Sequence, residues 1–136
     1  GYGHPDHIQV HRVGHRAADL ARAKGVASLR VFESTMNRTR IVAMMKMNPD
    51  AREDWDPEGP ADDGNPFGST EDEITMAVDV SAFVAAKRES ITCHASQVSD
   101  SSFFLQMPPD MFAIAFGTEW FIEPGAQGGA APGWFW

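Results

Sequence analysis

The chain has 136 residues, of which 43% are hydrophobic and 22% charged, a composition typical of one globular domain that excludes a wholly disordered protein. A single cysteine excludes an internal disulfide framework and suits a reducing compartment. No segment approaches the roughly eighteen consecutive apolar residues of a membrane span, so we expect a cytoplasmic protein with no membrane span. The formal net charge of −8 excludes a general affinity for nucleic acid, which requires clustered Lys and Arg.

This negative charge is concentrated in residues 49–73, which hold ten acidic residues and one arginine. Four prolines and three glycines in the same segment leave no helical or strand pattern, so we expect a solvated, mobile surface loop. A calcium site is the alternative, because Asp54, Asp56, Asp62 and Asp63 offer hard oxygen ligands. Their spacing, however, fits no EF-hand loop.

Before the acidic segment, the pattern predicts a helix, a strand and a second helix. The first helix runs from Pro5 to about Lys24, with proline in its first turn and Gly25 as its stop. Its apolar stripe consists of Val10, Val13, Ala17, Leu20 and Ala21. Residues 26–34 read as a strand because β-branched and aromatic residues partly alternate there, and residues 38–47 read as a short helix rich in methionine.

After the acidic segment, residues 73–80 alternate as a strand, and Ser81 begins a helix that we expect to continue to about Gln97. Residues 108–117 and 118–123 predict a last short helix and strand. Residues 124–136 form a Gly/Ala-rich tail that ends in aromatic residues. Within the helix from Ser81, we expect Cys93 to be a small buried residue, and we expect His94 and Gln97 to bind neighbouring loops by hydrogen bonds.

The opening residues, "GYGHPDHI", place two histidines and an aspartate within four positions. A position near a helix N-terminus disfavours the protonated imidazole, which suits His7 as a metal ligand, and Asp6 can accept a hydrogen bond from a neighbouring imidazole. The alternative is a polar helix start without a metal. His4, His7, His11 and His15 recur at spacings of three and four, a surface able to bind Zn²⁺, Ni²⁺ or Cu²⁺ adventitiously. The simpler interpretation leaves His11 at the edge of the apolar stripe and His15 exposed.

Three segments together resemble a known family: "GYGHPDHI", "EITMAVDV" and "AAKRESITCHASQV". They resemble the C-terminal half of the zinc-dependent N-acetylglucosaminyl deacetylases of the PIG-L/LmbE superfamily, especially the actinobacterial mycothiol-pathway type. The resemblance covers most of residues 1–123. It implies an α/β fold that is the C-terminal part of a Rossmann-like sandwich, and a small acetamido-sugar conjugate as substrate.

The resemblance also implies site residues. His7 looks like a zinc (Zn²⁺) ligand. His4 looks like the residue that steadies the tetrahedral intermediate and protonates the leaving amine. Asp6 resembles its orienting carboxylate, and Tyr2 a mobile group that helps to stabilise the oxyanion.

The chain departs from the family in one respect, because no His-Pro-Asp-Asp block occurs in it. That block supplies the other zinc ligands and the general base of the family. We therefore expect the C-terminal half of an enzyme, inactive alone, which needs the missing N-terminal half and exposes apolar faces through which it self-associates. The alternative is a non-catalytic α/β module, or a subunit that completes a site with another chain.

Overall fold

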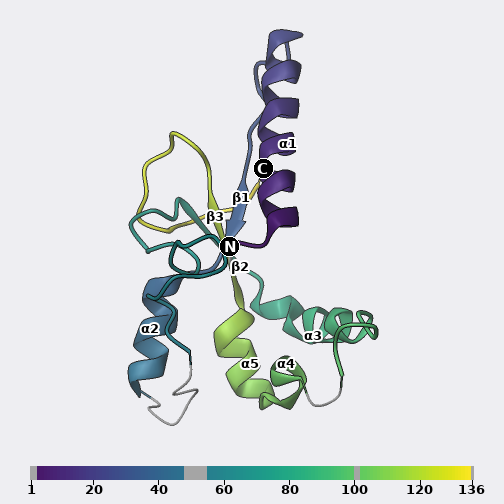
Figure 1. Cartoon of the computed structure of the whole chain (residues 1–136), viewed down its shortest axis with the longest axis vertical. Coiled ribbons are helices and arrows are strands. Elements are labelled where there is room, and N and C mark those ends of the chain that lie inside the picture. Colours follow the sequence, from purple (N-terminus) through teal and green to yellow (C-terminus); the bar gives the residue numbers. More distant parts are fainter. Residues whose placement is uncertain (1–2, 48–54, 100–101, 136) are drawn as a thin grey trace. The chain divides into compact units, whose positions relative to one another are not determined.

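The computed structural model describes residues 3–47, 55–99 and 102–135. Its chain divides into two compact units, which are described separately below. The first unit comprises residues 1–77 and 120–131, and the second comprises residues 78–119 and 132–136. Figure 1 shows the helices and strands of both. Among the helices of the described residues, none is both long and apolar enough to cross a membrane.

The first helix, α1 (Pro5–Ala23), confirms the predicted long N-terminal helix almost to the residue. Pro5 lies in its first turn, and Gly25, with φ of +94°, follows its C-cap Lys24. The apolar stripe, however, is not covered: Val10 is 72% exposed and Val13 67%. Ala18 is the buried residue of α1, so the helix contacts the rest of its unit along another face.

Strand β1 (Glu33–Thr35) is much shorter than the strand expected over residues 26–34. The backbone N–H of Val26 donates to the carbonyl of Ala21, and that of Ala27 donates to Gly25, so these residues complete the end of α1 instead of extending. A segment with a propensity for extended backbone forms a strand only where it pairs with another strand. Here the pairing with β3 begins at Glu33.

Helix α2 (Arg38–Met47) matches its predicted bounds, and Asn37 explains where it begins. Asn37 is buried, and its side-chain oxygen accepts the backbone N–H of Arg40 at 3.0 Å. Its side-chain nitrogen donates to Glu71 at 3.3 Å. Ser69 forms backbone hydrogen bonds with both neighbours of Asn37. The N–H of Ser69 donates to the carbonyl of Met36, and the carbonyl of Ser69 accepts the N–H of Arg38.

The described part of the acidic segment, residues 55–73, contains no helix and no strand, as its composition predicts. Pro60 and Pro66 form an isolated antiparallel bridge, and Asn37 and Ser69 form a parallel one. The mobility of the segment stays a prediction. Its remaining residues, including Asp54 of the calcium alternative, lie outside the described residues.

The four-stranded sheet has the order β1-β3-β2-β4, with β2 at Met76–Asp79, β3 at Thr118–Ile122 and β4 at Ala131–Pro132. β1 and β3 are antiparallel, with Glu33 opposite Ile122. The predicted alternation before and within β2 is confirmed, because Ile74, Met76 and Val78 are all buried. The α/β fold class is confirmed at this level.

The second unit contains a 3₁₀-helix, η1 (Ser81–Phe83), and helices α3 (Val84–Thr92), α4 (Phe103–Gln106) and α5 (Pro109–Phe116). Phe112 is fully buried in α5. Helix α3 ends at Thr92, whereas we expected this helix to continue to about Gln97. The hydroxyls of Ser90 and Thr92 donate to Lys87 and Glu89 and so compete for helical carbonyls. Cys93 follows this end and is exposed, so its expected burial is wrong.

Candidate functional site at the start of α1

His4 is the N-cap of α1, and its ring is oriented by the backbone of the same turn. The N–H of Asp6 donates to His4 Nδ1 at 3.2 Å. An imidazole that accepts at Nδ1 carries its proton at Nε2, so this contact selects one neutral tautomer. The carboxylate of Asp6 lies 3.8 Å from the same Nδ1 and is mostly exposed. Orientation of His4 therefore comes first from the main chain of Asp6.

His7 lies one helical turn further along α1 and is exposed. The rings of His4 and His7 meet edge to face, with 5.8 Å between their centroids. The structure thus brings together His4, Asp6 and His7 at one helix end. Tyr2, the fourth residue expected at this site, lies outside the described residues.

Asp63, from the acidic segment, lies beside the residue that precedes His4. Gly3 has φ of +80°, and a Cβ placed on it would come within 2.6 Å of Asp63 Cγ and of the Asp63 backbone nitrogen. The pKa of Asp63 is lowered, chiefly because Asn65 donates a hydrogen bond to its carboxylate. A charged carboxylate therefore adjoins the site, and no sequence signal placed it there.

His7 could give zinc one imidazole ligand, but among the described residues it belongs to no converging group of three or more His, Cys, Asp or Glu side chains. Within the described residues, the group of this kind consists of His11, His15 and Glu33. A shallow pocket of about 290 Å³ is lined by Val42, Met45 and Lys46 of α2 and by residues 55–58, with none of the expected site residues.

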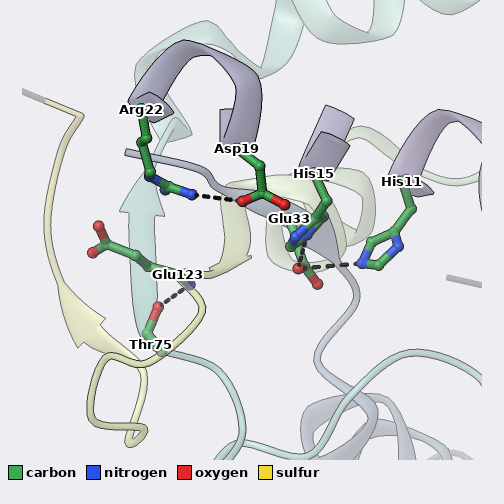
Figure 2. Close-up of polar contacts among 7 residues, drawn as sticks. All are labelled: His11, His15, Asp19, Arg22, Glu33, Thr75 and Glu123. Carbon is green, nitrogen blue, oxygen red and sulfur yellow. Dashed lines mark hydrogen bonds and ion pairs between the residues drawn. The ribbon is translucent and has the colours of Figure 1, made fainter. Parts of the chain in front are cut away.

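The second group, here called the His–Glu cluster (His11, His15 and Glu33), joins α1 to β1 (Figure 2). His15 Nε2 donates to Glu33 Oε1 at 2.7 Å, and His11 Nε2 lies 3.3 Å from the same oxygen. His15 is half-buried, although we expected it to be exposed. The spacing of four between the histidines was visible in the sequence. Glu33 was not, because it comes from a distant strand.

His94 and Gln97 remain close to their own helix end. His94 Nδ1 lies 3.2 Å from the carbonyl oxygen of Ser90, and the backbone N–H of Gln97 donates to the carbonyl of His94. His94 thus contacts its own helix, and the hydrogen bonds of His94 and Gln97 to neighbouring loops stay a prediction.

Comparison with known proteins identifies relatives over nearly the whole chain. A 1D-myo-inositol 2-acetamido-2-deoxy-alpha-D-glucopyranoside deacetylase of Salinispora arenicola is 34% identical over 98% of this chain, which is 44% of the relative. An enzyme of the same name from Nocardioides sp. is 31% identical over 94% of this chain and 46% of its own length. In Frankia alni, a deacetylase of this name numbered 2 is 31% identical over 98% of this chain and 48% of its own length.

No family model matches the chain, and no solved structure matches it. The chain spans a little under half the length of the curated relatives described above. The resemblance that the three sequence segments indicated is nevertheless confirmed by full-chain similarity to several deacetylases of one name. Over nearly all of its own residues, and a little under half of theirs, this chain is homologous to the 1D-myo-inositol 2-acetamido-2-deoxy-alpha-D-glucopyranoside deacetylases of the PIG-L/LmbE family.

Proposed function

We propose that this chain forms the C-terminal part of a zinc-dependent amide hydrolase that removes the acetyl group from an N-acetylglucosaminyl conjugate. The observation that carries the proposal is the 34% identity over 98% of the chain to a deacetylase whose name specifies an acetamido sugar linked to inositol. The position of His4 and His7 in the first turn of α1 supports it, because both imidazoles lie at one end of one rigid element.

His7 is proposed as one zinc ligand. Its exposure at the helix start leaves the ring accessible to ligands from outside the described residues. When bound, zinc polarises the amide carbonyl and lowers the pKa of water. A catalytic zinc needs two or three protein ligands, and we propose that the rest of the set comes from outside the described residues.

His4 is proposed as the general acid. With Nδ1 accepting from the N–H of Asp6, neutral His4 presents its Nε2–H as a hydrogen-bond donor to the developing oxyanion. To act as general acid, the ring must first take up a second proton at Nδ1, which displaces the contact with the N–H of Asp6. The carboxylate of Asp6, 3.8 Å from Nδ1, would then stabilise the imidazolium, and transfer of the Nε2 proton to the leaving amine would return His4 to its neutral form. Tyr2 is proposed, from the family resemblance, as a further donor to the oxyanion.

The second candidate is a non-catalytic α/β module, or a subunit that completes a site with another chain. One observation favours it: within the described residues, His7 belongs to no group of three or more His, Cys, Asp or Glu side chains whose ligand atoms converge. Both candidate functions use the same surface, which lies at the start of α1. They differ in whether that surface supports hydrolysis once the remaining ligands are supplied.

A chimera separates the two candidates. These 136 residues would replace the matching segment of the Salinispora arenicola relative, and hydrolysis would be measured as free amine released from an acetamido-sugar conjugate. We expect an active chimera that contains zinc, and loss of activity together with one equivalent of bound zinc in His7→Ala. His94→Ala, an exposed histidine of the second unit, is the matched control and should retain both. A folded chimera that contains zinc and releases no amine would support the non-catalytic module.

A further inference from the structure

The His–Glu cluster holds the groups of a metal site that the expected catalytic residues do not include. His11 and His15 are one turn apart on α1, so their rings lie on the same face, with centroids 4.4 Å apart. Both point to one carboxylate oxygen of Glu33, at the start of β1, as Figure 2 shows. The three ligand atoms lie within 4.8 Å of one another.

These distances are close to those of a tetrahedral metal site. Zinc bonds of about 2.0–2.1 Å place neighbouring ligand atoms of a tetrahedron about 3.3 Å apart. The Nε2–Oε1 distance of His11 is 3.3 Å, and that of His15, at 2.7 Å, needs to lengthen by only a fraction of an ångström. Two imidazoles and one carboxylate form a ligand set that zinc uses in proteins, with a fourth position open to water.

The charges of the cluster also favour a cation. The two imidazoles, with centroids 4.4 Å apart, converge on one carboxylate oxygen, and the negative charge of Glu33 attracts a cation there. The side chains of His15 and Glu33 are 37% and 29% exposed, which limits competition by water, whereas His11, at 54%, leaves a path for ion entry.

The position of the cluster gives the metal a structural role. Helix α1 has one buried residue, Ala18, and exposes the larger side chains of its apolar stripe, so little apolar packing holds it to its unit. The cluster is a polar connection between α1 and β1 across 18 and 22 residues of sequence. A metal there would fasten the helix that carries His4 and His7.

We propose that His11, His15 and Glu33 bind a divalent transition metal of the zinc type, which fastens α1 to β1. This proposal does not depend on the deacetylase activity. It requires only the folded 136-residue chain.

Direct titration of the 136-residue chain with Zn²⁺, and with Co²⁺ as a spectroscopic substitute, tests the proposal. We expect equimolar binding, a Co²⁺ absorption spectrum typical of tetrahedral coordination, and a rise in melting temperature on metal addition. Glu33→Gln keeps the shape of the side chain but removes its charge, and should weaken binding by roughly 10-fold or more. His11→Ala and His15→Ala should weaken it at least as much.

Two controls make the result specific. His7→Ala should leave the affinity, the Co²⁺ spectrum and the rise in melting temperature unchanged, because His7 is not part of the cluster, and so should His94→Ala. Circular dichroism of each variant identifies any that fails to fold; the more exposed His11 and the isosteric Glu33→Gln are the variants least dependent on packing. Absence of equimolar binding, or binding that survives Glu33→Gln but disappears in His7→Ala, would overturn the proposal.

Discussion

Arg30 and Glu123, 93 residues apart, form a two-pronged ion pair just beyond the antiparallel pairing of β1 and β3. Arg30 Nε donates to Oε1 at 2.8 Å, and Nη2 donates to Oε2 at 2.7 Å. The backbone N–H of Glu123 donates to the hydroxyl of Thr75, as Figure 2 shows. The hydrogen bond from Arg30 lowers the pKa of the Glu123 carboxyl from its ordinary value of 4.5.

This ion pair predicts an acid-dependent loss of stability. A carboxyl whose pKa is lower in the folded state stabilises the fold above its unfolded pKa, and that contribution disappears as the pH falls through the folded pKa. We therefore expect the urea midpoint to decrease below about pH 4.5. Glu123→Gln should lower the midpoint at about pH 7 and reduce its further decrease on acidification. An unchanged acid dependence in this variant would assign the effect to other carboxyls, such as Asp79, whose pKa Ser81 lowers.

Gly3→Ala is expected to reduce stability, because the site adjoins Asp63. Residue 3 has a positive φ, and the added methyl group would meet both the backbone and the side chain of Asp63. Strain of this kind costs about 1–3 kcal/mol, measurable by urea unfolding. Gly14→Ala is the matched control: Gly14 lies inside α1 with nothing near its missing Cβ, so alanine should stabilise the protein by about 0.5–1 kcal/mol. Equal effects of the two substitutions would contradict the close contact with Asp63.

His4 and His7 should respond differently to mutation in the active chimera. His4→Ala should retain zinc and lower kcat by roughly 10²-fold or more, the typical loss for one general acid or oxyanion donor. Asp6→Asn should have a smaller effect, because the backbone N–H that orients His4 is kept. Metal analysis with steady-state kinetics checks both. Loss of zinc in His4→Ala, with retention in His7→Ala, would reverse the assignment.

The exposed stripe of α1 predicts self-association of the 136-residue chain. Val10 and Val13, three residues apart on α1, are both exposed and form the apolar surface through which we expect copies of the chain to associate. We expect binding of a dye that reports apolar surface, and light scattering that rises with concentration. Replacement of both valines by glutamine should reduce the two signals, whereas Arg16→Lys, at an exposed position of the same helix, should not change them. A monomeric wild-type chain that binds no dye would indicate a complete domain and favour the non-catalytic module.

The elements that sequence predicted well are those that local interactions determine. Pro5 and Gly25 mark the ends of α1 by backbone restriction, and the alternation around β2 reports burial on one face. Residues 26–32 do not form the expected strand, because the local sequence does not determine which segment a strand pairs with. The short α3 depended on hydroxyls that compete with helical hydrogen bonds, a balance that composition alone does not decide.

The candidate site was predictable only where its residues are close in sequence. His4, Asp6 and His7 lie within four positions at one helix start, so the motif alone indicates that their side chains lie near one another. Glu33 contacts His15 of α1, and Asp63 lies beside Gly3 just before this helix. Both contacts join residues that are far apart in the sequence. Such contacts follow from the packing of the whole unit, for which the sequence pattern gives no distance.

The anchoring of the acidic segment by Asn37 has a consequence for protein engineering. Because one buried amide both starts α2 and holds Glu71, the last third of the segment is a fixed attachment point. The turn between Pro60 and Pro66, by contrast, closes on itself through its own bridge. A reporter peptide or affinity tag inserted at Gly64, where nothing lies within 4 Å of the missing Cβ, would therefore leave the attachment at Asn37 intact.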